Sequence, residues 1–291
     1  MTQTISKPFT EYIKQFENLP KEEQLFFLPA KTKAKGTVLC LHGFIAGPWQ
    51  FSPLAEQLSQ KGFNVFALRL ANHDFEDADQ TRNYTKLPLI CQFEDYLNDA
   101  IKFINTVNID HPIHLVGFSA GALVATYLST QFKTQSLTLV SPFFGIQKKH
   151  KLLRLFQFLG TIRFFRDRLN RKILTHPSER RFKSGTIKQL QYPLGSLVEL
   201  LNLADIIFPK AKEIKIPTHL LISDADEVID RQKALSFYDQ IKEENKSKTI
   251  FKKYQSAPHS MISDLQNPDT TSRHQAIQSI VAFCEGSAKD A

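Results

Sequence analysis

The sequence of 291 residues contains few cysteines and glycines and no long apolar run. Its three cysteines, Cys40, Cys91 and Cys284, are odd in number and lack the close spacing of metal ligands, so we expect neither a disulfide framework nor a zinc centre. Glycine is also scarce, at 11 residues, and four of these lie within residues 43–47 and 117–121. No apolar run approaches the roughly 18–20 residues that span a bilayer, and the N-terminus has no signal-peptide pattern. We therefore expect a soluble, cytoplasmic protein.

The remaining composition is that of an ordinary globular protein, with 42% hydrophobic and 23% charged residues. The length suits one large α/β domain, or a domain with an insertion, better than two equal domains. Short apolar runs alternate with amphipathic stretches, which predicts a mostly parallel sheet with helices on both faces. The expected strands are residues 37–41, 64–70, 113–117, 137–140, 219–222 and 249–254. The expected helices are residues 53–61, 92–107, 120–131, 231–241 and 271–284, with a further short helix at 9–16 and one or two edge strands around 25–28.

Residues 143–210 interrupt this alternation with a helical, Phe-rich and basic pattern. The segment holds 14 Lys and Arg against 4 Asp and Glu, whereas the rest of the chain holds 23 against 25. All of the excess positive charge therefore lies in this segment. We predict a core made of residues 1–142 and 211–291, with residues 143–210 inserted into it as a helical cap.

The strongest local motif is GFSAG at residues 117–121. It follows an apolar strand and opens a helix, the context in which G-x-S-x-G carries a nucleophile on a sharp strand-to-helix turn. The two glycines remove the Cβ atoms that would clash at such a turn. Ser119 is the predicted nucleophile, although a turn of small residues with an incidental serine has the same sequence.

A nucleophilic serine requires a base, and the base requires an orienting acid. Of nine histidines, His259 is the best placed, because it follows the last expected strand and precedes the last helix. Asp224 and Asp226 both follow the strand 219–222 and are both candidates for the acid. The chain order is then nucleophile, acid, base.

An oxyanion hole is expected from two backbone N–H groups, those of Phe44 and Ala120. Phe44 follows the dipeptide His42-Gly43 at the end of the first long strand, and Ala120 follows the predicted nucleophile. We interpret His42 itself as a structural residue. We further expect contacts to substrate from the side chains of Phe44, Phe118, Phe143 and Val228.

Taken together, residues 37–43, 117–121, 223–229 and 258–259 resemble the α/β-hydrolase superfamily, from about residue 36 onward. The branch that the chain resembles comprises bacterial monoacylglycerol lipases, lysophospholipases and carboxylesterases. The resemblance implies an α/β-hydrolase fold with a lid inserted after strand six. It also selects Asp226 as the acid, because in that branch a single residue separates the acid from Val-Ile, here Glu227 before Val228-Ile229.

The resemblance implies a serine ester hydrolase that works through an acyl-enzyme and needs no metal or organic cofactor. A thioesterase or acyltransferase would use the same catalytic groups, and a silent lipid-binding protein could keep the same pocket. A proline-type aminopeptidase fits poorly with the basic insert, because such enzymes need an acidic anchor for the substrate amine. The expected partner is a small acyl ester, and no nucleic-acid-binding motif is present.

The insert allows two interpretations. Apolar residues recur at helical spacing over residues 151–165, with basic residues around them. This segment is either a lid that covers the active site and offers an apolar wall to an acyl chain, or a set of helices packed on the core with a solvated basic face. In a sharper form of the first interpretation, the basic, Phe-rich lid contacts an anionic membrane or micelle.

Overall fold

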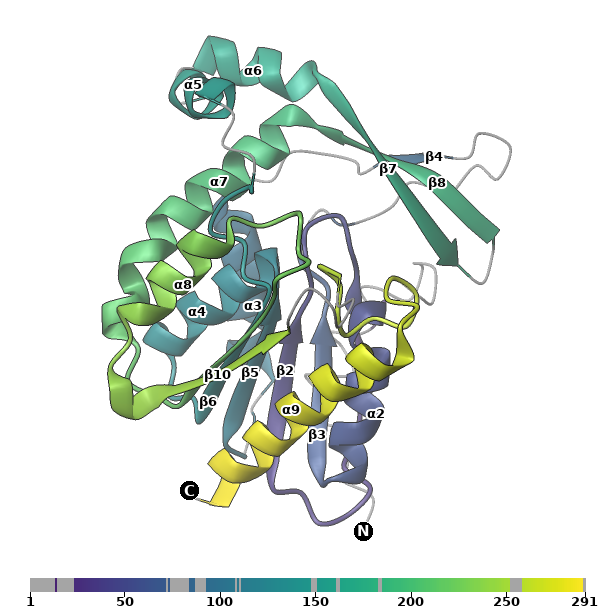
Figure 1. Cartoon of the computed structure of the whole chain (residues 1–291), viewed down its shortest axis with the longest axis vertical. Coiled ribbons are helices and arrows are strands. Elements are labelled where there is room, and N and C mark those ends of the chain that lie inside the picture. The colour runs from purple at the N-terminus through teal and green to yellow at the C-terminus, as the bar shows by residue number, and fades with distance from the viewer. Residues whose placement is uncertain are drawn as a thin grey trace.

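A twisted sheet of seven described strands forms the centre of the molecule in the computed structural model (Figure 1). The structure describes residues 14, 24–71, 73, 84–86, 93–107, 109, 111–147, 151–160, 163–182, 185–251 and 258–289. The strand order is β1-β3-β2-β5-β6-β9-β10, and every neighbouring pair is parallel except β1 with β3. The strands are β1 (Phe26–Leu28), β2 (Gly36–Leu41), β3 (Phe63–Leu68), β5 (Ile113–Phe118), β6 (Ser136–Val140), β9 (Thr218–Ser223) and β10 (Lys246–Phe251).

Helices cover both faces of this sheet, and each face has its own apolar core. Helices α2 (Ser52–Gln60) and α9 (Thr270–Lys289) pack on one face, as the front layer of Figure 1 shows. On the other face lie α3 (Phe93–Thr106), α4 (Ala120–Gln131) and α8 (Arg231–Asp239). Because both faces are covered, all residues of β2, β3, β5, β6 and β9 are buried. Such double burial explains why these strands are short, nearly continuous apolar runs in the sequence.

The predicted α/β architecture is confirmed element by element. Each of the six expected strands and five principal helices is present, with ends displaced by only a few residues. The expected edge strand is β1, which runs antiparallel to β3. Gly62 ends α2 with a φ of 91°, a left-handed conformation that glycine adopts without a side-chain clash. The expected helix at residues 9–16 and the end of the strand expected at 249–254 lie outside the described residues.

The segment between β6 and β9 is only partly helical, which corrects the prediction of a helical insert. It contains α5 (Lys151–Gly160), α6 (Arg163–Arg171), the antiparallel strands β7 (Ile173–Phe182) and β8 (Gly185–Pro193), α7 (Leu194–Ile207) and the 3-10 helix η2 (Phe208–Glu213). Pro177 explains the change to strand, since proline inside a helix removes a hydrogen bond and clashes with the preceding turn. A shift in the β7–β8 register directly follows Pro177, as is usual where a strand accommodates proline.

Elements α5, α6, β7 and β8 lie above the C-terminal edge of the central sheet in Figure 1, and α7 runs from there down the side of the core. Strand β8 also pairs with β4 (Tyr84–Lys86), so the small second sheet takes one strand from the chain before β5. Helix α7 packs on the core through buried leucines, whereas α5 and α6 pack on α7. In the described part of the chain, no helix combines the length and the apolar character that crossing a bilayer requires.

Candidate active site

Ser119 occupies the sharp turn between β5 and α4. Its φ of 53° and ψ of −113° are outside the ordinary regions for a residue with a side chain, so the turn is strained. The backbone holds it there: the Ser119 N–H donates to the Val140 carbonyl at 2.9 Å, and the Ser119 carbonyl accepts from Phe143 N–H at 3.2 Å and Ala122 N–H at 3.1 Å. The side chain therefore projects from a fixed point at the N-terminus of α4.

Two glycines permit this turn to pack against its neighbours. A Cβ on Gly121 would lie 2.0 Å from the carbonyl oxygen of Leu41, and one on Gly117 would lie 2.5 Å from Cα of Ala122. Neither distance is compatible with a real carbon contact. The glycines of the GFSAG motif are therefore required by the close approach of α4 to β2 and to the turn itself.

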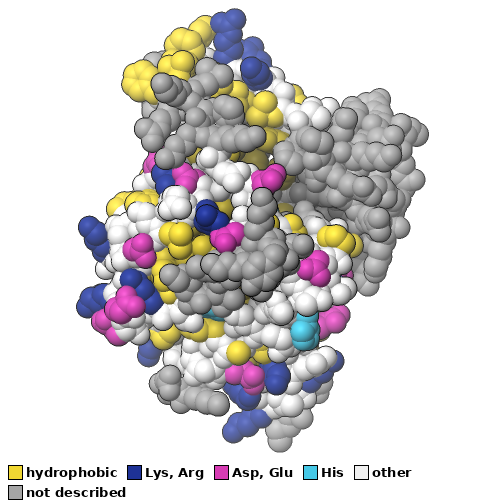
Figure 2. Space-filling view, viewed as in Figure 1, with side chains coloured by type: hydrophobic (Ala, Val, Ile, Leu, Met, Phe, Trp, Pro, Cys, Tyr) yellow, Lys and Arg dark blue, Asp and Glu magenta, His cyan; other side chains and the backbone are white. Residues whose placement is uncertain are grey.

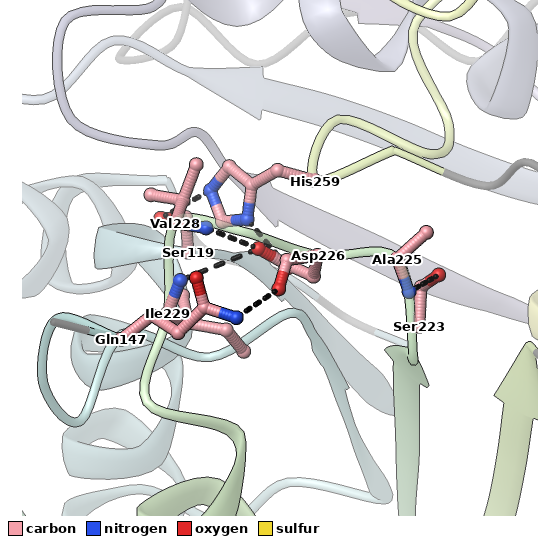
Figure 3. Close-up of polar contacts among 8 residues, drawn as sticks. All are labelled: Ser119, Gln147, Ser223, Ala225, Asp226, Val228, Ile229 and His259. Atoms are coloured by element: carbon pink, nitrogen blue, oxygen red, sulfur yellow. Dashed lines mark hydrogen bonds and ion pairs between the residues drawn. The ribbon is translucent and has the colours of Figure 1, made fainter. Parts of the chain in front are cut away.

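His259 joins the serine to an acid (Figure 3). Its Nε2 lies 3.1 Å from Ser119 Oγ, and its Nδ1 lies 2.7 Å from Asp226 Oδ2. An ionised carboxylate only accepts hydrogen bonds, so Nδ1 carries the proton and Nε2 presents its lone pair to the serine hydroxyl. The structure thus brings together three residues that lie 107 and 33 positions apart in the sequence.

Both carboxylate oxygens of Asp226 accept hydrogen bonds. Its Oδ1 accepts hydrogen bonds from the backbone N–H groups of Val228, at 2.9 Å, and Ile229, at 3.3 Å. Burial acts to raise the pKa of Asp226, but the charge and hydrogen bond of His259 and the two backbone donors outweigh it, so the pKa lies below its ordinary value. Asp226 therefore stays ionised beside the imidazole at neutral pH.

The loop that carries Asp226 is fixed by the loop after β6. Ile146 and Ile229 form an antiparallel bridge, and the Gln147 N–H donates to the Val228 carbonyl at 3.2 Å. The Gln147 side chain also reaches the carbonyl of Asp226 at 3.5 Å (Figure 3). The position of the acid thus depends on backbone pairing between two loops at the same sheet edge.

Asp224, the other candidate for the acid, has a different partner. Its carboxylate forms an ion pair with Arg231 in the first turn of α8. The geometry therefore separates the two carboxylates: Asp226 contacts His259, and Asp224 anchors the start of a helix.

The two expected oxyanion donors lie at the ends of β2 and β5. Ala120 is the first residue of α4, where a backbone N–H has no intrahelical acceptor and the helix dipole favours negative charge. Within the described residues, neither the Ala120 N–H nor the Phe44 N–H has a protein acceptor. Both groups therefore retain the capacity to donate to a ligand.

The loop that carries Phe44 is fixed by His42 and by Gln50. His42 Nε2 accepts the Leu70 N–H at 3.0 Å, which leaves Nδ1 as the donor to the Gly43 carbonyl at 2.9 Å. Gln50, which is buried, accepts the Gly43 N–H at 3.0 Å and donates to Gln266 at 2.8 Å. His42 is thus structural in this fold. Gln50 belongs to none of the sequence motifs, and its only signal in the sequence is a polar side chain among the apolar residues of PWQF.

The four side chains expected to contact substrate lie in different surroundings. Phe118 is buried, with its ring 5.0 Å from that of His259, and Phe143 is buried in the core. Val228 is 42% exposed, and Phe44 is half-buried with its ring 5.2 Å from that of Tyr192. Their contact with substrate stays a prediction. Among the described residues, His, Cys, Asp and Glu side chains form no cluster suited to a metal ion.

Solved structures with the same architecture are α/β-hydrolases. A monoacylglycerol lipase from Paleococcus ferrophilus aligns with a TM-score of 0.68 and 17% identity over 92% of this chain and 100% of the lipase. A soluble variant of the monoglyceride lipase from Saccharomyces cerevisiae aligns with a TM-score of 0.69 and 12% identity, over 91% of each chain. A thermostable carboxyl esterase from Bacillus coagulans gives 0.63 and 14% identity over 91% of this chain and 94% of the esterase. The chain therefore has the α/β-hydrolase fold.

The sequence itself gives the family. Residues 32–266 match the hydrolase family described as serine aminopeptidase, S33. This match covers most of the chain, so the protein belongs to that family and is a hydrolase. No curated protein sequence matches the chain at a significant level.

Proposed function

We propose that this protein is a serine hydrolase that cleaves carboxylic esters. The observation that carries the proposal is the hydrogen-bonded chain from Ser119 through His259 to the buried carboxylate of Asp226. Its position at the carboxyl edge of an α/β-hydrolase sheet, and the lipases and esterases of similar fold, support ester chemistry. A carboxylesterase or a lipase for monoacylglycerols or lysophospholipids fits best.

The proposed reaction forms and then hydrolyses an acyl-enzyme. Ser119 Oγ attacks the ester carbonyl carbon while His259 Nε2 takes the hydroxyl proton. The carbonyl oxygen becomes an oxyanion, and the N–H groups of Phe44 and Ala120 donate to it. His259 then gives its proton to the leaving alkoxide, which departs as the alcohol.

Deacylation repeats these steps with water. His259 Nε2 takes a proton from a water molecule, whose oxygen attacks the acyl carbon. Ser119 leaves, recovers the proton from His259, and the carboxylic acid is released. Asp226 holds the Nδ1–H tautomer throughout and stabilises the imidazolium that forms twice in each cycle.

Turnover of p-nitrophenyl butyrate by the wild type and by Ser119→Ala tests this proposal. We expect kcat to fall by about 10³–10⁶ in the variant while the circular dichroism spectrum stays unchanged. Acyl-CoA assayed beside the oxygen ester separates an esterase from a thioesterase, and amino-acid p-nitroanilides test for the peptidase activity that the family description names. Equal turnover by the wild type and the Ser119→Ala variant would contradict the proposal.

We also propose that the basic insert contacts an anionic lipid surface. Four apolar side chains of α5 and α6 are exposed: Leu155, Phe158, Phe164 and Phe165. Cationic side chains of α6 and of the residue after it, Arg166, Arg168, Arg171 and Lys172, lie close to them in sequence, and Figure 2 shows apolar and basic side chains together at the top of the molecule. Exposed aromatic residues beside cations suit the boundary of an anionic bilayer.

Flotation with liposomes tests this contact. We expect binding to vesicles that contain phosphatidylglycerol, and weaker binding after the double substitution Phe158→Ser and Phe164→Ser. Equal binding to neutral vesicles, or none to either kind, would contradict the proposal.

A further inference from the structure

The loop after β2 contains a strained residue next to the proposed oxyanion donor. Ile45 has a φ of 52°, in the left-handed region that a β-branched side chain disfavours strongly. It directly follows Phe44, whose N–H is the proposed donor. Such strain persists only where surrounding contacts hold the backbone in place.

On the core side, polar contacts hold this loop at Gly43 and again at Gly47, whose carbonyl accepts the Gln50 N–H at 3.1 Å, whereas within the described residues Phe44 and Ile45 have none. His42 donates to the Gly43 carbonyl, and the buried Gln50 accepts the Gly43 N–H. The position of the next two residues therefore depends on what packs against their side chains.

Phe44 also packs against the main core, with its ring 6.2 Å from that of His73, whereas among the described residues Ile45 packs only in the cluster that the insert forms. Tyr192, near the end of β8, is 9% exposed and forms an apolar cluster with Phe44, Ile45, Leu174 and Leu197. The rings of Phe44 and Tyr192 meet edge to face, with centroids 5.2 Å apart and planes at 84°. Tyr192 is paired with Leu174 across the β7–β8 hairpin, and Leu197 follows in α7. The cluster thus joins the end of the hairpin to the loop.

We propose that Tyr192 is a positioning residue that holds the strained loop with the Phe44 N–H directed at the reacting carbonyl oxygen. This inference rests on the proposed ester hydrolysis. When the hairpin packs against the loop, the contact of Tyr192 with Phe44 stabilises the left-handed conformation of Ile45. When this contact is absent, the loop relaxes and one oxyanion donor is lost. The insert then controls catalysis through the backbone at Phe44, in addition to any contact with the acyl chain.

The test compares Tyr192→Ala and Tyr192→Phe on a soluble short-chain p-nitrophenyl ester. Because an oxyanion donor acts in the transition state, we expect Tyr192→Ala to lower kcat by about 10- to 100-fold while KM changes by less than about 3-fold. Tyr192→Phe keeps the ring contact and should retain kcat within about 2-fold. Leu169→Ala is the control, because Leu169 packs in the neighbouring cluster of Leu194 and Val198, which meets the Tyr192 cluster at Leu174 but includes neither Phe44 nor Ile45, so kcat should stay unchanged.

Two inhibitors separate positioning from loss of structure. Ser119 Oγ adds to the carbonyl carbon of a trifluoromethyl ketone, and the proton of the serine hydroxyl passes to His259. The ketone oxygen then becomes an oxyanion. The matching amide binds with its carbonyl intact. Tyr192→Ala should weaken binding of the ketone by the same factor by which it lowers kcat, and it should leave binding of the amide unchanged. Tyr192→Leu, which keeps more of the apolar volume, gives the same comparison if the alanine variant does not fold.

The strain itself is tested with Ile45→Gly, since glycine adopts a positive φ at no steric cost. Added to Tyr192→Ala, it should recover part of the lost kcat. No recovery, an effect confined to KM, or an equal loss in Leu169→Ala would overturn the inference. These outcomes leave the wild type active, whereas failure of the proposed function would appear as a wild type that hydrolyses no ester.

Discussion

At the residue scale, two carboxylates two positions apart have separate partners. Asp226 contacts His259 Nδ1, and Asp224 forms an ion pair with Arg231. We expect Asp226→Asn to lower kcat by about 10⁴, because an amide at this position favours the wrong imidazole tautomer. Asp224→Asn should change kcat by less than about 10-fold. Steady-state kinetics on one ester decide between them, and a larger loss in Asp224→Asn would reverse the assignment.

Gln50 gives a second prediction at this scale. Gln50→Leu leaves the buried Gly43 N–H without an acceptor, which should lower the free energy of unfolding by about 1–3 kcal/mol. It should also lower kcat by about 10- to 100-fold, because the neighbouring Phe44 N–H loses its fixed position. Gln57→Leu, at a hydrogen bond on the exposed side of α2, is the control and should change neither quantity. An unchanged kcat in Gln50→Leu would exclude this role.

The sequence could predict site residues that local motifs mark. Ser119 lies in GFSAG, and His259 lies between a strand and a helix, so their elements alone bring them to one sheet edge. The choice between Asp224 and Asp226 needed a family resemblance, since both follow β9. Gln50 and Tyr192 depend on contacts between distant segments, which have no local signature in the sequence.

At the element scale, the crossing of α4 over β2 depends on Gly121. Gly121→Ala places a Cβ 2.0 Å from the Leu41 carbonyl oxygen, so backbone must move. We expect the free energy of unfolding to fall by about 3 kcal/mol or more. Gly286→Ala is the matched control: nothing lies within 4 Å of its Cβ position in α9, so stability should stay equal or rise by up to about 1 kcal/mol. Urea denaturation measures both, and equal effects would contradict the packing argument.

In the insert, the periodicity of apolar residues predicts only part of the secondary structure. The apolar spacing of residues 151–165 correctly indicated helices, because an amphipathic face recurs there. Residues 173–193 share the basic character but form a hairpin. Pro177 disfavours a helix there. The hairpin also pairs with β4, about a hundred positions earlier, a contact that no local pattern contains.

At the scale of the whole molecule, two buried histidines make stability depend on pH. Burial lowers the pKa of His114 and of His219 to about 4, from an ordinary 6.5. Between these values the unfolded chain binds protons that the folded protein does not, so the free energy of unfolding falls as the pH drops from 6.5 towards 4. Each histidine should cost up to roughly 3 kcal/mol by pH 4. Asp226 contributes mainly below this window, because its carboxyl protonates near the ordinary 3.8 in the unfolded chain and at a lower pH in the folded protein.

Urea titrations at pH 7 and pH 4.5 measure this dependence. His219→Gln should reduce the difference in unfolding free energy between the two pH values, since its side chain binds no proton. A wild type equally stable at both values would contradict the account.

Covalent labelling by an alkyl fluorophosphonate tests the central claim most directly, that Ser119 is a nucleophile activated by His259. Intact mass spectrometry should show one adduct per chain, and peptide mapping should place it on Ser119. The adduct should be absent in Ser119→Ala and form at least about 100-fold more slowly in His259→Ala. A folded wild type that stays unlabelled, or equal labelling of Ser119→Ala, would contradict the account.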